Sequence, residues 1–263
     1  MFINPNFYLA LPLAAALFFA GRALGSASVA ISLRRTAGAV FFLLALVSLS
    51  IPLTYLAGSL GENPAYANFR ALPYAELTVC LAAPFVGRLS LLLPLNRGIA
   101  LLFCLVITLG YVSLPFIKPI VRPAGEIVEQ WRDGIAIQST SATCGPASMA
   151  TLMHRLGVSA TQSEIARQSY NSGSGTENWY LARYAKSQGF SYRFLNEPDL
   201  ENVPVPSIIG VRLGRVGHFI TLLSKEGATY TVGDSLDGVH QLTEAEFKQR
   251  YRFAGFVLQI GRE

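Results

Sequence analysis

Four side chains in the C-terminal half of the sequence have the types and the order of a thiol-based catalytic site. The first is Cys144, in the stretch "TCGPA", where the spacing of apolar residues predicts a helix from Cys144 to Leu156. A cysteine in the first turn of a helix faces unpaired backbone N–H groups and the positive end of the helix dipole, which stabilise a thiolate. Pro146 suits the same turn, because its missing N–H costs nothing there. An ordinary helix start with a small buried thiol is the alternative interpretation.

Gln138 is the second candidate and lies six residues before Cys144, at the end of the extended run Gly134–Gln138. Its side-chain amide could donate a hydrogen bond to a developing oxyanion, together with the backbone N–H of Cys144. Such a donor is worth about 3 kcal/mol of transition-state stabilisation. Taken alone, Gln138 also fits a solvated loop residue.

His218 and Asp234 are the third and fourth candidates, in two strand-like runs that flank the turn "KEG". The turn centres near Glu226, and each candidate is eight positions from that centre. If the two strands pair through the turn, the imidazole and the carboxylate lie side by side. The carboxylate would then hold the tautomer of the ring and stabilise its charged form. Asp237 is the fallback for this role, but it lies beyond the strand.

The remaining histidines and cysteines have simpler explanations. His154 falls in the middle of a predicted helix as a surface residue, and His240 in "GVHQLT" fits an edge or a loop. Cys80 and Cys104 lie in apolar runs, where they serve as small hydrophobic side chains. Cys144 is the single cysteine after residue 120, so no disulfide forms within that part. Three histidines and one thiol without ligand spacing predict no metal, and we expect no cofactor.

The first 120 residues contain long uncharged stretches that could cross a membrane. The whole chain of 263 residues is 51% hydrophobic and 14% charged, which is too apolar for an average soluble protein. A helix needs about 20 apolar residues to cross the hydrocarbon core of a bilayer. We expect about four spans, at residues 5–24, 37–57, 74–95 and 98–117.

Two of these spans have alternative interpretations. The first could be a signal peptide, but no Lys or Arg precedes Arg22, so a retained span is favoured. The third contains Glu76 and Arg88 around two apolar runs. It is either one span with Arg88 reaching toward the headgroups or a re-entrant or interfacial piece.

The net charge of +5 comes entirely from the first 118 residues, so it indicates membrane topology rather than nucleic-acid binding. Short loops on the cytoplasmic side of a membrane carry an excess of Lys and Arg. Arg22, Arg34 and Arg35 flank the first connection, and four spans also place Arg88 and Arg97 inside. The C-terminal domain is then periplasmic, at a bacterial inner membrane. Three spans would place it in the cytoplasm.

The composition changes at Lys118, where a connecting segment rich in proline, glycine and charged residues begins. We expect a transmembrane helical domain at 1–120 and a water-soluble domain at 121–263, which is large enough to bury its own core. In the second domain, helix patterns come first and strand patterns follow, the order of an α+β fold with helices on an antiparallel sheet. The predicted helices cover 144–156 and 177–188, with two more starting at the capping boxes 161–164 and 243–246; the predicted strands are 191–195, 207–213, 218–224, 228–233 and 253–260.

The stretches "QSTSATCGPA", "GHFITLL" and "VGDSLDG" together resemble the C39 peptidases, papain-like cysteine proteases found as N-terminal domains of bacteriocin-exporting ABC transporters. The resemblance runs from about residue 135 to residue 260. It implies that Cys144 is the nucleophile, His218 the general base and acid, Asp234 its orienter and Gln138 the oxyanion donor. It also implies a papain-like fold for this domain.

The sequence departs from the family pattern in two ways. The usual Asp-Pro after the histidine strand is Asp234-Ser235, and the chain contains no Walker motif and has its membrane part before the peptidase-like part. The family's cleavage of a leader peptide after small residues therefore enters as an expectation about the substrate.

The sequence as a whole predicts a membrane-anchored cysteine peptidase acting by a Cys-His-Asp mechanism. The expected partners are a peptide or protein substrate, the lipid bilayer and a secretion or export system, with no nucleic acid. Two alternatives remain open. One is a non-catalytic docking module that binds a leader peptide or a secretion partner. The other is an acyl-enzyme transferase, because the same four residues serve hydrolysis and acyl transfer.

Overall fold

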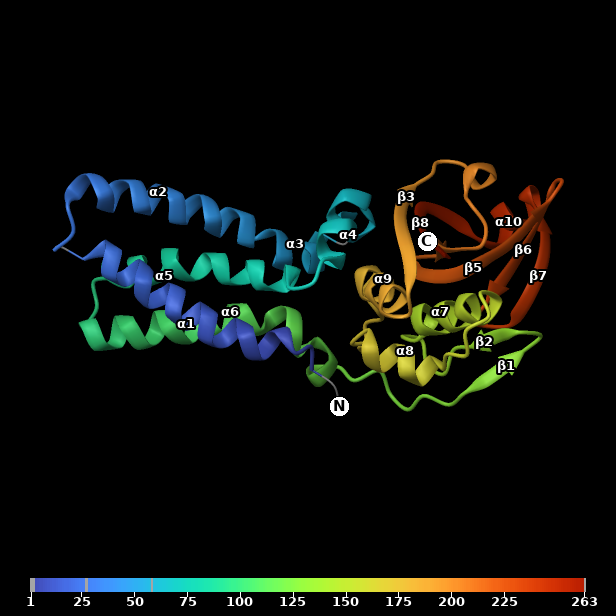
Figure 1. Cartoon of the computed structure of the whole chain (residues 1–263), viewed down its shortest axis with the longest axis horizontal. Helices are drawn as coiled ribbons and strands as arrows, with labels where there is room; N and C mark the ends of the chain where they lie inside the picture. Colours follow the sequence, from blue (N-terminus) through green and yellow to red (C-terminus); the bar gives the residue numbers. More distant parts are fainter. Residues whose placement is uncertain (1–2, 27, 58, 263) are drawn as a thin grey trace. The chain divides into compact units, whose positions relative to one another are not determined.

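The computed structural model describes residues 3–26, 28–57 and 59–262, and the chain folds as two units (Figure 1). The helical unit comprises Ile3–Gly58 and Pro73–Lys118. The mixed unit comprises Pro119–Glu263 together with Ser59–Leu72, a segment that the hydropathy pattern groups with the first 120 residues. The mixed unit is therefore built from two separate parts of the chain.

The helical unit contains three helices that are long and apolar enough to cross a membrane: Asn6–Gly25, Ile31–Thr54 and Arg97–Val121. A fourth span exists if Pro64–Ala71 and Ala75–Leu89, which meet at 94°, count as one. Long apolar helices therefore lie where the first, second and fourth spans are predicted. The predicted span at 74–95 has no single long helix. The elements are α1 (Asn6–Gly25), α2 (Ile31–Ser48), α3 (Ser50–Ala57), η2 (Ala75–Ala82), α5 (Ala83–Leu89) and α6 (Arg97–Val121).

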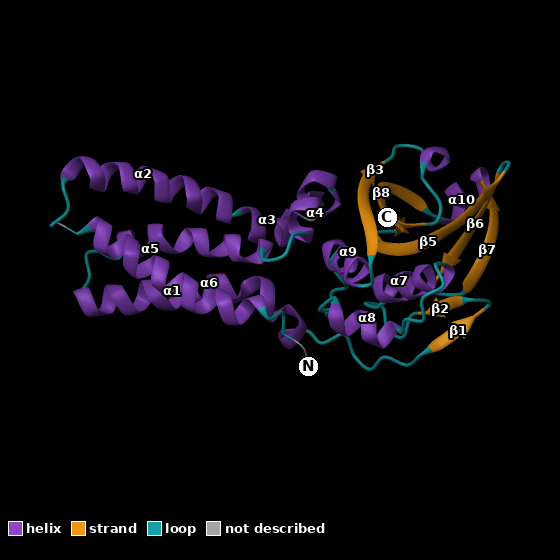
Figure 2. Cartoon of the chain, in the orientation of Figure 1, coloured by secondary structure: helices purple, strands orange, loops and turns teal. Residues whose placement is uncertain are grey.

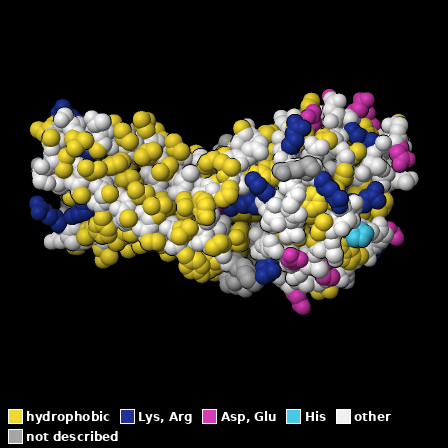
Figure 3. Space-filling model, in the orientation of Figure 1, with side chains coloured by type: hydrophobic (Ala, Val, Ile, Leu, Met, Phe, Trp, Pro, Cys, Tyr) yellow, Lys and Arg dark blue, Asp and Glu magenta, His cyan; other side chains and the backbone are white. Residues whose placement is uncertain are grey.

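Helices α1 and α5 touch through their backbones. A Cβ atom added to Gly21 would lie 2.0 Å from the Pro84 carbonyl oxygen, and one added to Gly87 would lie 2.0 Å from the Phe18 carbonyl oxygen. Small residues at such crossings let helices approach closely, as in membrane-embedded bundles. Hydrophobic side chains cover most of the face of this unit that Figure 3 shows, where a water-soluble bundle would be polar. The packing and the surface both suit a lipid environment.

The mixed unit holds an antiparallel six-stranded sheet in the order β3-β8-β4-β5-β6-β7 and a separate two-stranded sheet (Figure 2). The expected α+β class with an antiparallel sheet is confirmed. Its strands are β1 (Gln130–Arg132), β2 (Ile135–Ile137), β3 (Phe190–Asn196), β4 (Ser207–Leu213), β5 (Val216–Glu226), β6 (Thr229–Asp234), β7 (Gly238–Thr243) and β8 (Arg252–Arg262).

Both faces of the large sheet are buried, and neighbouring residues of one strand point into different cores. Ile208 of β4 belongs to a core with Met149 and Trp179, whereas Ile209 belongs to a second core with Phe247 and Val257. The alternation follows from the two-residue period of a strand.

The helices of the mixed unit are η1 (Ser59–Glu62), α4 (Pro64–Ala71), α7 (Cys144–Arg155), α8 (Gln162–Gln168), α9 (Asn178–Ser187), η3 (Leu200–Asn202) and α10 (Glu244–Arg250).

The predicted helices and strands of this unit agree with the structure to within a few residues, but β7 and the β1–β2 hairpin were not fully anticipated. Strand β7 lies at the edge of the sheet, and its residues alternate between more and less exposed positions. Its polar side chains give it no apolar run, which is the signal that a single sequence offers for a strand.

Helix α4 packs against α9 and β3, although it precedes them by more than 100 residues (Figure 1). The guanidinium of Arg70 lies 4.3 Å from the ring centre of Trp179. Arg183 of α9 donates hydrogen bonds to the carbonyl oxygens of Arg70, Ala71 and Leu72 at 2.6, 3.2 and 2.7 Å. These carbonyls end α4, where a helix has no partners of its own for them. Arg183 therefore caps α4 from a different helix.

Replacing Arg183 with alanine should lower the free energy of unfolding of the mixed unit by about 2 kcal/mol, because charged hydrogen bonds to three carbonyls are lost. Arg193→Ala is the matched control, since Arg193 is an exposed residue of β3. Thermal unfolding of the full chain in detergent measures both variants. Equal midpoints for the two would show that the docking of α4 adds no stability.

Candidate active site

Cys144 is the first residue of α7, and its thiol is partly exposed. The preceding residue shapes the turn: the Thr143 hydroxyl accepts the backbone N–H groups of Ser139 and Thr140 at 3.0 and 3.1 Å. The helix is tied to β5 about one turn later, where the Ser148 hydroxyl donates to the Phe219 carbonyl oxygen at 3.0 Å. These bonds hold the start of α7 beside the strand that carries the candidate base.

His218 on β5 and Asp234 at the end of β6 form a direct pair, with 2.8 Å between Nε2 and Oδ1. Both side chains are buried. Their expected position opposite each other is wrong, because the chain turns between Glu226 and Thr229 rather than at Glu226, and Thr221 therefore pairs with Gly233. The two residues are instead diagonal neighbours, a separation that long side chains bridge.

The imidazole of His218 hydrogen-bonds to Asp234 and lies near enough to the Cys144 thiol for the two groups to influence each other's charge. Because Nε2 is used by the carboxylate, Nδ1 is the nitrogen that remains for the thiol. Burial alone lowers the pKa of His218, but the hydrogen bonds and charges of Asp234 and Cys144 outweigh it and raise the pKa from 6.5 to about 9. The arrangement therefore favours a charged imidazolium beside the sulfur at neutral pH.

The Asp234 carboxylate is held by three donors. Oδ1 accepts from His218 and from the Leu236 N–H at 3.0 Å, and Oδ2 accepts from the Tyr251 hydroxyl at 2.6 Å. Burial raises the pKa of Asp234, but these hydrogen bonds outweigh it and lower the pKa to about 2. The carboxylate thus stays ionised next to the ring. Tyr251, whose hydroxyl also accepts from Arg250 Nε at 2.8 Å, was not among the predicted site residues.

Tyr251→Phe should lower the turnover number about fivefold and leave the overall fold unchanged, since one hydrogen bond to a carboxylate is lost while the ring is retained. The pKa of Asp234 should rise, because a donor that stabilises its charged form is gone. Tyr230→Phe is the control, as Tyr230 is another buried tyrosine in the same core. Equal rates for wild type and Tyr251→Phe would contradict the role.

Gln138 follows β2 and is joined to Ser235, the residue after Asp234. The backbone N–H of Gln138 donates to the Ser235 carbonyl oxygen at 2.8 Å, and the Ser235 hydroxyl donates to Gln138 Oε1 at 2.7 Å. Gln138 Nε2 donates to the Thr140 carbonyl oxygen at 2.9 Å. The four predicted residues are therefore linked: His218 to Asp234 through a hydrogen bond, Cys144 to His218 through its effect on the charge of the ring, and Gln138 to the segment after Asp234 through Ser235.

The residues considered less suitable for catalysis lie elsewhere. Asp237 pairs with His240 at 2.6 Å and with Arg250, and it does not reach His218. His154 lies near the end of α7 against the Trp131 ring. Cys80 and Cys104 are buried in the helical unit. Within the residues that the structure describes, no group of three or more potential ligands could hold a metal ion.

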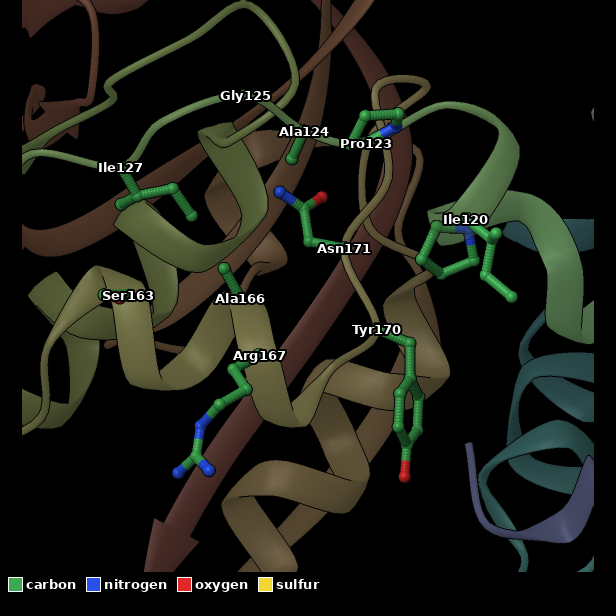
Figure 4. Close-up of a pocket in the computed structure, with 11 residues that line it drawn as sticks. Ile120, Pro123, Ala124, Gly125, Ile127, Ser163, Ala166, Arg167, Tyr170 and Asn171 are labelled. Carbon is green, nitrogen blue, oxygen red and sulfur yellow. The ribbon is translucent and has the colours of Figure 1, made fainter. Parts of the chain in front are cut away.

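A cavity of about 630 Å³ opens in the mixed unit between the segment after α6 and helix α8 (Figure 4). Residues that line it include Pro123, Ile127, Ala166, Tyr170 and Asn171. None of the four candidate catalytic residues is part of this lining. The chemical assignment therefore rests on the hydrogen-bonded groups and not on the cavity.

Residues 132–262 match the model of the Peptidase C39 family, a range that holds all four candidate residues. The chain is also similar to two curated relatives. An uncharacterised protein of Methanothermobacter thermautotrophicus is 30% identical over 128 residues, which are 49% of this chain and 88% of the relative. An uncharacterised protein of Methanothermobacter marburgensis is 31% identical over 129 residues, 49% of this chain and 89% of the relative. The chain belongs to the peptidase C39 family.

Solved structures of the same kind are more distant. The peptidase domain of Streptococcus ComA, a bifunctional ABC transporter involved in quorum sensing, is 19% identical with a TM-score of 0.43, and the match covers 48% of this chain and 96% of that domain. A double glycine motif protease from an AMS/PCAT transporter, solved in complex with the leader peptide, is 17% identical with a TM-score of 0.41. That match covers 54% of this C39 chain and 94% of the other.

Proposed function

We propose that the chain is a membrane-anchored cysteine peptidase that cleaves a peptide or protein substrate. The observation that carries this proposal is the row Cys144, His218, Asp234, in which the carboxylate hydrogen-bonds to the imidazole and the thiol interacts with the same ring. A structural cysteine needs no such partners, and a pure docking module needs no ionised carboxylate behind a histidine. Membership of the peptidase C39 family supports the same reaction class.

In the proposed reaction the proton of the Cys144 thiol already resides on His218 as the imidazolium, and the Cys144 thiolate attacks the carbonyl carbon of the scissile peptide bond. The Cys144 N–H, in the first turn of α7 where the helix supplies no acceptor, and the Gln138 amide stabilise the oxyanion. The imidazolium then protonates the leaving amine as the C–N bond breaks, which leaves a thioester on Cys144. Water, deprotonated by His218, attacks the thioester, releases the carboxylate product and restores the thiolate–imidazolium pair.

Packing within the mixed unit supports the four-span arrangement. Segment 59–72 belongs to the same folded unit as the peptidase residues, so both must lie on the same side of a membrane. The chain between them must then cross an even number of times. Helix α6 supplies one crossing, so η2 with α5 must supply the other.

The length of η2 and α5 is compatible with a crossing, although they contain only 15 residues. A 3₁₀-helix rises about 2.0 Å per residue and an α-helix about 1.5 Å, so the pair reaches about 26 Å, against a hydrocarbon core of about 30 Å. Four crossings place Arg22, Arg34, Arg88 and Arg97 on the side opposite to the peptidase. By the positive-inside rule, the peptidase domain then faces away from the cytoplasm.

The chemistry is tested with a peptide carrying a thiol-directed electrophile, added to the full chain in detergent. The proposal expects modification at Cys144 with a rate that falls sharply in His218→Ala. A labelling rate independent of His218 would contradict the peptidase.

The topology is tested with a C-terminal reporter that is active in one compartment only. A signal from a cytoplasmic C-terminus would contradict the four spans.

A further inference from the structure

We infer that Ser235 is a positioning residue that sets the direction of the Gln138 amide, so that an N–H of Gln138 points toward the developing oxyanion. The inference rests on the proposed peptidase function. Ser235 occupies the position after the catalytic carboxylate, where the C39 peptidases that this sequence resembles usually have proline. Proline has no hydroxyl, so this contact is a feature of the present chain.

The orientation of the amide follows from its two neighbours. The Gln138 atom 2.9 Å from the Thr140 carbonyl oxygen must be the nitrogen, because a carbonyl oxygen accepts hydrogen bonds and cannot donate them. The other amide atom, 2.7 Å from the Ser235 hydroxyl, is then the oxygen, and the hydroxyl donates to it. Ser235 and Thr140 thus each favour the same one of the two possible orientations.

This orientation leaves one N–H of Gln138 for a substrate. An amide nitrogen carries two hydrogens, and Thr140 is the one acceptor that the described residues provide for it. The second hydrogen remains for the oxyanion. A flipped amide would present its carbonyl oxygen instead, and two negative oxygens would then repel each other in the transition state.

Ser235 is well placed to hold this orientation firmly. The residue is buried, with 1% of its surface exposed, so water does not compete for the hydroxyl. Its carbonyl oxygen also accepts the backbone N–H of Gln138, which makes the contact a two-bond clamp between residues 97 positions apart. Because Asp234 precedes it directly, the same short segment positions the histidine and the oxyanion donor.

The test compares two reactions of Cys144 with small probes that need no recognition of a peptide. Acylation by p-nitrophenyl acetate passes through an oxyanion, whereas alkylation by iodoacetamide does not. Both rate constants are measured on the full chain in detergent, with Cys144→Ala as the background for the thiols of Cys80 and Cys104. We expect Ser235→Ala to slow acylation about tenfold and to change alkylation less than twofold.

A double-mutant cycle separates positioning from a structural effect. Gln138→Ala should slow acylation about 100-fold, and adding Ser235→Ala to it should cause no further loss, since Ser235 acts through Gln138. Ser207→Ala is the matched control, because Ser207 is a buried serine whose hydroxyl bonds to the Pro204 carbonyl oxygen instead. It should leave both rates unchanged.

Each other outcome overturns a defined claim. Equal slowing of acylation and alkylation by Ser235→Ala, or the same loss with and without Gln138, would mean that Ser235 supports the fold or the His218–Asp234 pair and does not position the amide. Unchanged acylation in Ser235→Ala, with slow acylation in Gln138→Ala, would remove the role of Ser235 alone. A Cys144 that reacts with neither probe would overturn the peptidase and this inference together.

Discussion

Replacing Cys144 with alanine will abolish peptide cleavage, with a loss of turnover of about a million-fold or to the limit of detection. No other side chain of the row Cys144, His218, Asp234 can form the acyl-enzyme, and removing the nucleophile of such a unit costs as much as removing the whole unit. The substitution removes one partly exposed sulfur at the start of α7 and leaves the core residues of that helix in place. Folding and membrane insertion should therefore be normal.

The measurement is a comparison of the N-termini of exported peptides in cells that carry the wild-type or the Cys144→Ala chain. Cys104→Ala is the matched control, because it removes a buried thiol from the helical unit and leaves the row intact. Unchanged processing in Cys144→Ala would favour the docking module, for which the thiol is dispensable. A substrate that is consumed but gains an amine or thiol acceptor in place of water would identify an acyl transferase.

The local part of the site could be predicted from the sequence. Cys144 lies at a helix start that the apolar spacing and Pro146 predict, and the structure begins α7 at that residue. His218 begins an apolar run that predicts a strand, so its position at the start of that strand also follows from one short segment of the sequence. Such signals are local because the periods of helices and strands are local.

The contacts between distant segments could be predicted only in part. Counting from the turn brought His218 near Asp234 but gave the wrong register, since the chain turns between Glu226 and Thr229 and not at Glu226. The bulge between Leu222 and Ser224 then shifts the pairing by one residue, and a bulge leaves no regular trace in the alternation of one strand. Tyr251 reaches Asp234 only because α10 turns the chain back between them. The docking of α4 on α9 likewise depends on packing, and neither segment carries a sequence pattern that predicts it.

Asp234→Asn will be the second most damaging substitution, with a loss of turnover of about a hundredfold or more. The amide keeps the size of the carboxylate but removes its charge, so it no longer stabilises the imidazolium and no longer selects the correct tautomer. The raised pKa of His218, about 9, depends on hydrogen bonds and charges from Asp234 and Cys144. Without the carboxylate, the pKa of His218 should fall toward its ordinary value of 6.5.

The variant also changes the dependence on pH. In the wild type the charged His218 stabilises the fold fully below pH 6.5, and this stabilisation is lost as the pH rises through about 9. The lowered pKa of Asp234 has the opposite effect, with its stabilisation present above pH 3.8 and lost as the pH falls through about 2. Stability and the positive charge of His218 should both decline between pH 6.5 and 9 in the wild type. In Asp234→Asn this alkaline decline should be weaker for stability, and His218 should lose its charge at lower pH.

The measurements are the titration of the His218 ring by NMR and thermal unfolding, each followed from pH 4 to pH 10. Asp237→Asn is the matched control, because Asp237 is a neighbouring carboxylate that pairs with His240 and Arg250 and does not touch His218. It should keep the wild-type alkaline limb near pH 9. An Asp234→Asn profile that coincides with the wild type would mean that the carboxylate does not set the charge of the ring, because a charge that stabilises the imidazolium cannot be removed without lowering its pKa.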